Sequence, residues 1–319
     1  MARPKHFIPH GVIPAALTIF NDDLSINVAQ TRKHFQHMAG TPGVTALTLN
    51  GHAAEVHALT DDEQQQLLEL GAESIGDNVS IVAGVYADGS HHAGRIAKMA
   101  EKAGANALLV FPSQVFMLGG AMRPEMALAH YRTIADATDL PIILFEYPMN
   151  TGMGFPFETI LKLCEEIPSI AAMKDWCHDP LLHEKHTCTL QSLPRPINML
   201  TTHSSWLMSS LVMGAKGLLS GAGSVIADMQ VALFNAVQAK DLALAEKINN
   251  DMYPIAQALY ASPFVDMHNR MKECLALLGR CDKAVVRPPL MKLTNTEIDG
   301  LRRALAAAHV QPEGWRPTD

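Results

Sequence analysis

The sequence lacks the features that mark several large classes of protein. It has five cysteines, an odd number, and none forms a CxxC pair, which argues against a disulfide framework and a structural zinc site. No run of like charges is present, and the net charge of −7 argues against a surface for nucleic acid or anionic lipid. No apolar stretch is long enough to span a bilayer, and the first residues lack the apolar core of a signal peptide. We therefore expect a soluble cytoplasmic protein that binds neither nucleic acid nor membrane.

Short apolar runs alternate with amphipathic segments along most of the 319 residues. The runs are typical of buried parallel strands, and they are Val12–Phe20, Val44–Asn50, Val79–Tyr86, Ala107–Pro112, Pro141–Tyr147, Ile170–Lys174, Ile197–Thr202 and Gly217–Gly221. The clearest segments with apolar residues at helical spacing are Ala29–Met38, Asp61–Ile75, His91–Ala103, Glu125–Ala137 and Phe157–Glu165. This alternation, with right-handed crossovers, predicts an α/β fold, a (β/α)₈ TIM barrel.

A doubly wound open sheet is the rival fold. We disfavour it because no glycine-rich phosphate loop follows the first apolar run, which leads instead into Asn21-Asp22-Asp23. After Asp228 the strand signal stops, and the pattern becomes helical over Met229–Ala239, Leu242–Tyr260, Phe264–Gly279 and Thr296–His309. We expect residues 1–228 to form the barrel, closed by the first of these helices. Residues 229–319 are expected to pack on it as a C-terminal helical extension of a single structural unit.

In a barrel of this kind the chemistry lies at the carboxyl ends of the strands. The segments expected there are Asn50–Glu55, Ser113-Gln114, Phe145-Glu146-Tyr147, Lys174-Asp175-Trp176, Thr202-His203-Ser204 and Ser220-Gly221. Lys174 is the most informative of these residues, because burial at the end of a strand disfavours a charged amine and lowers its pKa. A neutral amine can attack a ketone or aldehyde and form a Schiff base. The alternative is that Lys174 reaches water or pairs with Asp175.

Five stretches together resemble the dihydrodipicolinate synthase / N-acetylneuraminate lyase superfamily. They are the opening segment Gly11–Asp23 with its F-x-x-D turn, Gly51-x-x-x-Glu55 followed by Leu59-Thr60, Leu144–Gly152, Ala172–Asp175 and Gly214–Ser220. No single motif is decisive, but their order and spacing extend over nearly the whole chain. The resemblance implies a class I enzyme on a (β/α)₈ barrel that acts on pyruvate or another 2-oxo acid. It also implies that Lys174 is the imine-forming lysine and that no cofactor is needed.

The sequence departs from the family at other positions. Phe145 stands where the family has a tyrosine that moves protons, and His52-Ala53 replaces a pair of hydroxyl residues. A tyrosine that a neighbouring subunit contributes falls near Ser113-Gln114, and Asn150 replaces the arginine that synthases use to hold a second carboxylate. The resemblance therefore implies a divergent member that is not a dihydrodipicolinate synthase, with a substrate whose far end is neutral or apolar.

Proton transfer needs another group. His52 is the first candidate, since its unperturbed pKa is near neutral, and Tyr147 and Glu146 follow. The alternative for His52 is that it only binds a carboxylate or hydroxyl of the substrate, and the alternative for Tyr147 is that it only packs. Glu55 is expected to order its own loop rather than to contact the substrate. The predicted site has Lys174, Tyr147 and His52 as catalytic residues, and the expected substrate-binding residues are Gly51, Ala53, Phe145, Glu146, Leu219 and Ser220.

Two further patterns are weighed and set aside. His183-x-x-His186 lies on an expected helix but lacks an acidic partner, so no metal site is predicted. Gly221-Ala222-Gly223-Ser224 precedes a helix and could hold a phosphate, but the family resemblance favours barrel closure.

We predict a Schiff-base lyase, an aldolase or dehydratase of pyruvate or a substituted 2-oxo acid, with an aldehyde as candidate co-substrate. A homo-oligomer, a dimer or tetramer, is implied by the resemblance alone. The first alternative is a non-catalytic 2-oxo acid binding or regulatory protein on the same barrel, and the second is a metal-dependent aldolase.

Overall fold

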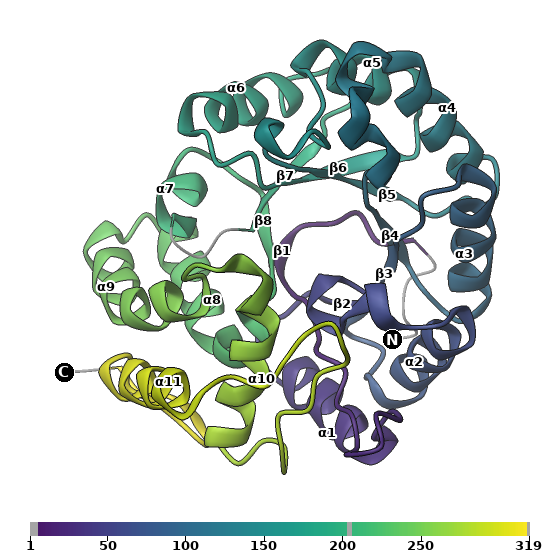
Figure 1. Ribbon diagram of the computed structural model, residues 1–319. Helices are drawn as coiled ribbons and strands as arrows, with labels where there is room; N and C mark the ends of the chain where they lie inside the picture. The colour runs from purple at the N-terminus through teal and green to yellow at the C-terminus, as the bar shows by residue number, and fades with distance from the viewer. Residues whose placement is uncertain (1–5, 203–205, 318–319) are drawn as a thin grey trace.

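The computed structural model describes residues 6–202 and 206–317. A barrel of eight parallel strands forms its centre (Figure 1). The strands are β1 (Gly11–Pro14), β2 (Ala46–Leu49), β3 (Ser80–Val85), β4 (Ala107–Val110), β5 (Ile142–Glu146), β6 (Ile170–Asp175), β7 (Asn198–Thr201) and β8 (Gly217–Ser220). Their order is β1-β8-β7-β6-β5-β4-β3-β2, and parallel bridges from Val12 to Val44 and from Ala15 to Thr48 join β1 to β2. The predicted (β/α)₈ TIM barrel is therefore confirmed.

Helices surround the barrel (Figure 1). They are α1 (Val28–Ala39), α2 (Asp61–Ser74), α3 (Ser90–Lys102), α4 (Pro124–Ala135), α5 (Phe157–Glu166), α6 (Pro180–Leu190), α7 (Leu207–Val212) and α8 (Gly223–Gln238). The helices predicted between the early strands begin and end within two residues of α1 to α5. In α2 the Thr60 hydroxyl accepts from the Glu63 amide while the Glu63 carboxylate accepts from the Thr60 amide, a capping box that marks where the helix begins.

The first predicted strand, Val12–Phe20, is longer than β1. The chain remains buried through Phe20, but strand pairing ends at Pro14. Beyond it, the Leu17 amide donates to Nε2 of His34 (3.3 Å) and the Ile19 amide donates to Oγ1 of Thr31 (3.1 Å). The second half of this apolar run is therefore a buried loop and not a continuation of the strand, and side chains accept the hydrogen bonds of its backbone amides.

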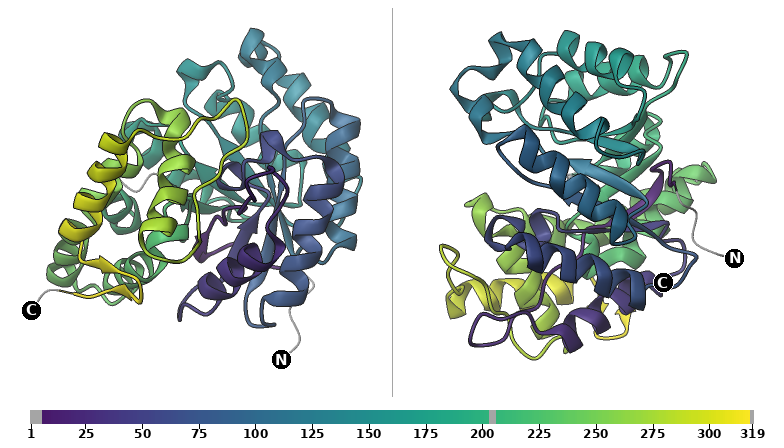
Figure 2. Two further views of the ribbon diagram at one scale, coloured as in Figure 1. Left: turned by 60° about the horizontal axis from the view of Figure 1, so that its bottom comes forward. Right: turned by 90° about the vertical axis from the view of Figure 1, so that its right-hand side faces the viewer.

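The C-terminal helices pack on one side of the barrel (Figure 2). They are α9 (Leu242–Leu259), the 3₁₀ helix η6 (Phe264–Asp266), α10 (Met267–Leu277) and α11 (Asn295–Ala307). The predicted boundary at Asp228 falls inside α8, because the last barrel helix begins at Gly223 rather than at Met229. A short antiparallel hairpin, β9 (Val310–Gln311) and β10 (Gly314–Trp315), was not predicted, since two-residue strands leave no periodic signal.

Short 3₁₀ helices follow three of the strands at their carboxyl ends. They are η1 (His52–Ala54) and η2 (Val56–Ala58) after β2, η3 (Gln114–Leu118) and η4 (Gly120–Met122) after β4, and η5 (Met149–Thr151) after β5. Because all the strands are parallel, these segments surround one end of the barrel, which we call the mouth. Among the described residues, every helix is too short or too polar to cross a lipid bilayer.

Candidate active site

A pocket opens at the mouth of the barrel around Lys174. About 480 Å³ of space free of atoms lies within it, its opening to solvent included. Residues from β2, β4, β5, β6 and from the C-terminal helices line it: Ala15, Thr48, Gly51, His52, Ala53, Leu109, Phe145, Lys174, Trp176, Thr202, Gly221, Tyr260, Met267 and His268. The predicted location of the site at the strand ends agrees with this pocket. Predicted residues His203 and Ser204 lie outside the described part of the chain.

Lys174 lies near the carboxyl end of β6 and is buried, with 7% of its surface exposed. Its Nζ lies over the Phe145 ring, 3.8 Å from the centroid. Burial lowers the pKa of Lys174 from 10.5 to about 7. A large share of the amine is therefore neutral near pH 7 and able to act as a nucleophile. The neighbouring Asp175 carboxylate is bonded elsewhere, so the alternative in which the two residues pair is not seen.

His52 and Tyr147, far apart in sequence, form a hydrogen-bonded pair. His52 Nε2 lies 2.8 Å from the Tyr147 hydroxyl oxygen. Burial, followed by the charges of His268 and Lys174, lowers the pKa of His52 well below its usual value. Burial likewise raises the pKa of Tyr147 well above its usual value. Both groups are therefore neutral near pH 7, and their hydrogen bond fixes the ring of His52, which lines the pocket.

The predicted substrate-binding residues divide into two sets. Gly51, Ala53 and Phe145 line the pocket, and their binding of substrate stays a prediction. Glu146, Leu219 and Ser220 are not among the described residues that line the pocket.

The Glu146 carboxylate is buried and accepts the Phe155 amide (3.0 Å). It points away from the pocket because successive side chains of β5 alternate faces and Phe145 faces inward. Leu219 is fully buried within β8, and Ser220 Oγ lies 3.2 Å from the Tyr260 hydroxyl, which itself reaches the lining. Burial, followed by the charge of Asp175, raises the pKa of Glu146 well above its usual value, which fits a wall residue.

Nine lining residues were not named as site residues. Trp176, Thr202 and Gly221 belong to segments that were expected at the strand ends, and Ala15, Thr48 and Leu109 lie on or next to strands. Tyr260, Met267 and His268 come from the end of α9 and the start of α10, and no local pattern reveals that these helices lie against the mouth. Burial, followed by the charge of Lys174, lowers the pKa of His268 to about 3, so it too is neutral.

Glu55 links the loop after β2 to the C-terminal helices. Its backbone is left-handed (φ 56°), and its buried carboxylate pairs with Nζ of Lys272 in α10 and accepts the Arg287 amide (2.9 Å). Lys272 also donates to the Val285 carbonyl (2.8 Å). The structure supports the expectation that Glu55 orders its loop. The same contacts hold His52 in η1 close to His268 in α10, with ring centroids 6.0 Å apart.

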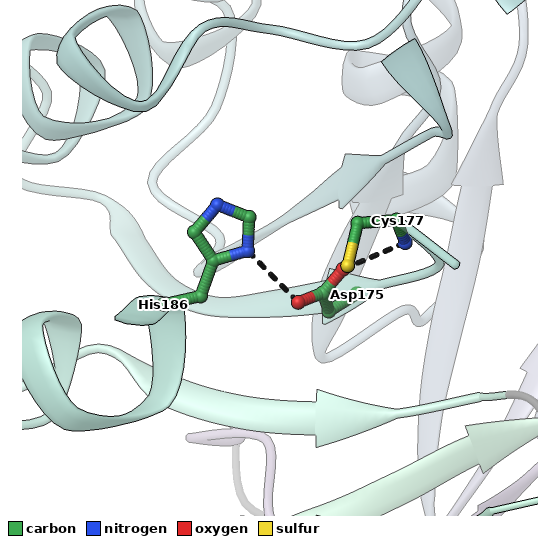
Figure 3. A group of neighbouring side chains, drawn as sticks. All are labelled: Asp175, Cys177 and His186. Atoms are coloured by element: carbon green, nitrogen blue, oxygen red, sulfur yellow. Dashed lines mark hydrogen bonds and ion pairs between the residues drawn. The ribbon is translucent and has the colours of Figure 1, made fainter. Parts of the chain in front are cut away.

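Asp175 is the centre of a buried hydrogen-bond network beside Lys174. Its Oδ2 accepts from Nδ1 of His183 (2.8 Å) and Nδ1 of His186 (2.9 Å), and its Oδ1 accepts the Cys177 amide (2.8 Å). Figure 3 shows His186 and Cys177 on either side of the carboxylate. Burial alone raises the pKa of Asp175, but the hydrogen bonds from the two histidines lower it below its usual range. The network holds an ionised carboxylate and fixes the end of β6.

Asp175 is an acidic partner for the two histidines of the His183-x-x-His186 pattern. Potential ligand atoms of Asp175, Cys177 and His186 lie within 4.8 Å of one another, close enough to hold a metal ion. Each of these side chains already has a hydrogen-bond role, since Cys177 Sγ donates to the Asp179 carbonyl (3.3 Å). Hydrogen bonding therefore accounts for the arrangement, and the absence of a metal stays a prediction. The sequence pattern missed Asp175 because it lies on a strand, while the histidines lie on α6.

Known proteins are similar to this chain over nearly its whole length. The model of the dihydrodipicolinate synthetase family matches residues 8–308. A 4-hydroxy-tetrahydrodipicolinate synthase of Methanopyrus kandleri is 27% identical over 309 residues, covering 95% of this chain and 98% of the relative. An uncharacterized DapA-like lyase of Halobacterium salinarum is 29% identical over 300 residues, covering 93% of each chain.

Solved structures share the fold. A monomeric dihydrodipicolinate synthase variant superposes with a TM-score of 0.86 at 20% identity, covering 94% of this chain and 97% of that one. An Escherichia coli K12 prophage protein of the dihydrodipicolinic acid synthase family, solved in complex with pyruvate, gives a TM-score of 0.85 at 21% identity, with coverage of 94% and 98%.

Proposed function

This chain belongs to the dihydrodipicolinate synthetase family, and we propose that it is a Schiff-base lyase of pyruvate or a substituted 2-oxo acid. The observation that carries the proposal is Lys174, a buried lysine with a pKa of about 7 inside the pocket at the barrel mouth. The family's lyases support chemistry of this type. The pyruvate complex of the Escherichia coli relative supports pyruvate as the first ligand to test.

The proposed chemistry begins at the amine of Lys174. The neutral amine attacks the keto carbon of the substrate, and loss of water gives a protonated imine. The imine accepts the electron pair of a bond to the adjacent carbon C3. A carbon–carbon bond can then break or form there, or a hydroxyl group β to the keto carbon can leave. We propose that backbone amides of the loop from Gly51 to Ala53, which lines the pocket, bind the substrate carboxylate.

His52 is the proposed group that exchanges protons with the substrate. It lines the pocket, it is neutral, and Tyr147 is hydrogen-bonded to its Nε2. In this proposal the imidazole of His52 itself takes and gives the proton, and the hydrogen bond with Tyr147 fixes the tautomer of His52. The pair replaces the family tyrosine, whose position Phe145 occupies without a hydroxyl group.

The proposal does not extend to dihydrodipicolinate synthesis. Asn150, which stands where synthases have an arginine, is exposed in η5 and is absent from the described lining of the pocket. The described lining of the pocket thus offers no arginine for a second carboxylate. The sequence resemblance further suggests a homo-oligomer, and this also stays a proposal.

Borohydride trapping tests the function. The protein is incubated with pyruvate, reduced, digested and mapped by mass spectrometry. We expect the reduced adduct on Lys174 and none on Lys272, the buried lysine that is paired with Glu55. The Lys174→Met variant serves as the matched control. No adduct on the folded protein across a panel of 2-oxo acids would overturn the proposal and leave a non-covalent 2-oxo acid binding protein as the better reading.

A further inference from the structure

Aromatic rings contribute to the lining of the pocket around Lys174. Phe145 lies under the Lys174 amine and is almost fully buried, whereas Trp176 and Tyr260, which also line the pocket, are half-buried. The ring centroids of Phe145 and Trp176 are 6.3 Å apart. Phe264, in η6, lies behind the outer part, 6.2 Å from the Trp176 centroid and 6.5 Å from that of Tyr260. We call Phe145, Trp176, Tyr260 and Phe264 the aromatic wall.

The wall is assembled from distant parts of the chain. Phe145 lies on β5 and Trp176 follows β6, whereas Tyr260 ends α9 and Phe264 begins η6. The C-terminal helices lie beside the barrel in Figure 1. Met267, at the start of α10, adds a further apolar side chain to the lining. Such a wall favours a flat apolar group, because aromatic rings bury large areas and add stacking contacts at centroid distances of about 4.5–7 Å.

The charge of the pocket lining also favours an apolar group on the substrate. Among the described lining residues, Lys174 is the one with a side chain of charged type, and its amine becomes part of the imine. The lowered pKa values of His52 and His268 leave these two histidines neutral. A carboxylate or phosphate at the far end of a substrate would lose its hydration without gaining a described counter-charge, which is costly. A neutral far end meets no such penalty.

Building on the proposed lyase function, we propose that the natural acceptor is an aromatic aldehyde whose ring lies against the aromatic wall. In the synthetic direction, His52 takes a proton from C3 of the pyruvate imine, which gives the enamine; C3 then attacks the aldehyde carbon and a C3–C4 bond forms. The aldehyde oxygen takes that proton back from His52, and hydrolysis of the imine releases a 4-aryl-4-hydroxy-2-oxobutanoate and regenerates Lys174. In cleavage the 4-hydroxyl returns its proton to His52 and the electron pair of the C3–C4 bond moves into the imine.

An acceptor panel tests the proposal. With pyruvate saturating, product formation is measured by liquid chromatography and mass spectrometry for benzaldehyde, cyclohexanecarboxaldehyde and succinic semialdehyde. These compare an aromatic ring, a saturated ring of similar size and an anionic chain. We expect kcat/KM for benzaldehyde to exceed that for the saturated ring by about tenfold and that for succinic semialdehyde by at least a hundredfold.

Substitutions in the aromatic wall test whether the preference for benzaldehyde depends on these rings. Trp176→Leu is expected to lower kcat/KM for benzaldehyde more than tenfold and to reduce its advantage over cyclohexanecarboxaldehyde, and Trp176→Phe is expected to restore most of the loss. Phe264→Leu gives a second test from behind the wall. Trp315→Leu is the matched control, because Trp315 lies on β10 and is not part of the pocket lining.

The outcomes separate this proposal from the lyase function itself. An adduct on Lys174 together with faster turnover of the anionic or saturated aldehyde would overturn the aromatic acceptor and leave the lyase function standing. An adduct without condensation of benzaldehyde would do the same. No adduct with any 2-oxo acid would overturn both.

Discussion

Replacing Lys174 by methionine should stabilise the fold at neutral pH, and the gain should shrink as the pH rises. The pKa of Lys174 is lowered from 10.5 to about 7 by burial. Since one pKa unit corresponds to about 1.4 kcal/mol, charging this lysine costs roughly 5 kcal/mol more in the folded protein than in the unfolded chain. Methionine has a similar length and no charge, so its variant avoids that cost.

The sign follows from where the proton resides. Below pH 7 the lysine is protonated in both states, and the full cost is present. Between pH 7 and 10.5 the unfolded chain still holds the proton while the folded protein has released it, so wild-type stability rises with pH. The advantage of Lys174→Met should therefore fall by about 1.4 kcal/mol per pH unit in this window, or roughly 3 kcal/mol from pH 7 to 9.5.

Urea unfolding of both proteins between pH 6.5 and 9.5 measures this difference, and titrations common to the two proteins cancel. Lys272→Met is the matched control, because Lys272 is also buried but is paired with Glu55. Removing its charge leaves the Glu55 carboxylate buried without its partner, so we expect destabilisation by about 3–5 kcal/mol, opposite in sign. A pH-independent difference between wild type and Lys174→Met would refute a lowered Lys174 pKa.

Three further results are expected. The rate of pyruvate trapping on Lys174 should fall about tenfold per pH unit below pH 7 and level off above it, because only the neutral amine attacks; a flat profile down to pH 5.5 would contradict the lowered pKa. Tyr147→Phe should leave trapping unchanged while lowering carbon–carbon bond turnover by about 10²–10⁴-fold, as measured by product formation; equal losses in both would mean that Tyr147 only supports the fold. Asp175→Asn should destabilise the protein by about 3 kcal/mol in urea unfolding, since the buried network loses its ionised acceptor; unchanged stability would show that the network contributes little.

Most of the barrel could be predicted because its signals are local. Each parallel strand is buried on both faces and reads as a short apolar run, and each surrounding helix carries an apolar stripe. The capping box at Thr60 even marks the first residue of α2. The strand predicted over Val12–Phe20 is longer than β1, because a buried loop and a paired strand show the same apolar pattern in the sequence.

The lining of the pocket was predictable only where it follows from the strand ends. Lys174, His52 and Phe145 were found because parallel strands in a barrel place their carboxyl ends together. Tyr147 and His52 were both named as site residues, but the hydrogen bond between them was not predicted. Tyr260 and His268 were missed because their place depends on how the C-terminal helices pack on the barrel, which no short pattern encodes.

Glu146 and Asp175 show the same limit on a smaller scale. Glu146 was itself a predicted substrate-binding residue and Asp175 follows Lys174. The side chains of both nevertheless leave the pocket and bind other elements, Glu146 the Phe155 amide and Asp175 the histidines of α6. Alternation along a strand decides which neighbour faces inward. The register of that alternation at the last residues of a strand is set by tertiary contacts.

Exchange of the pyruvate methyl protons in D₂O tests the central claim most directly, because it requires both the Lys174 imine and removal of a proton from C3. The loss of the methyl signal is followed by proton NMR for the wild type, Lys174→Met and Tyr147→Phe. We predict rapid deuteration with the wild type, none above the buffer rate with Lys174→Met, and strongly slowed deuteration with Tyr147→Phe. A wild-type protein that traps pyruvate on Lys174 but deuterates it no faster than buffer would contradict a catalytic role and identify an imine-forming binding protein instead.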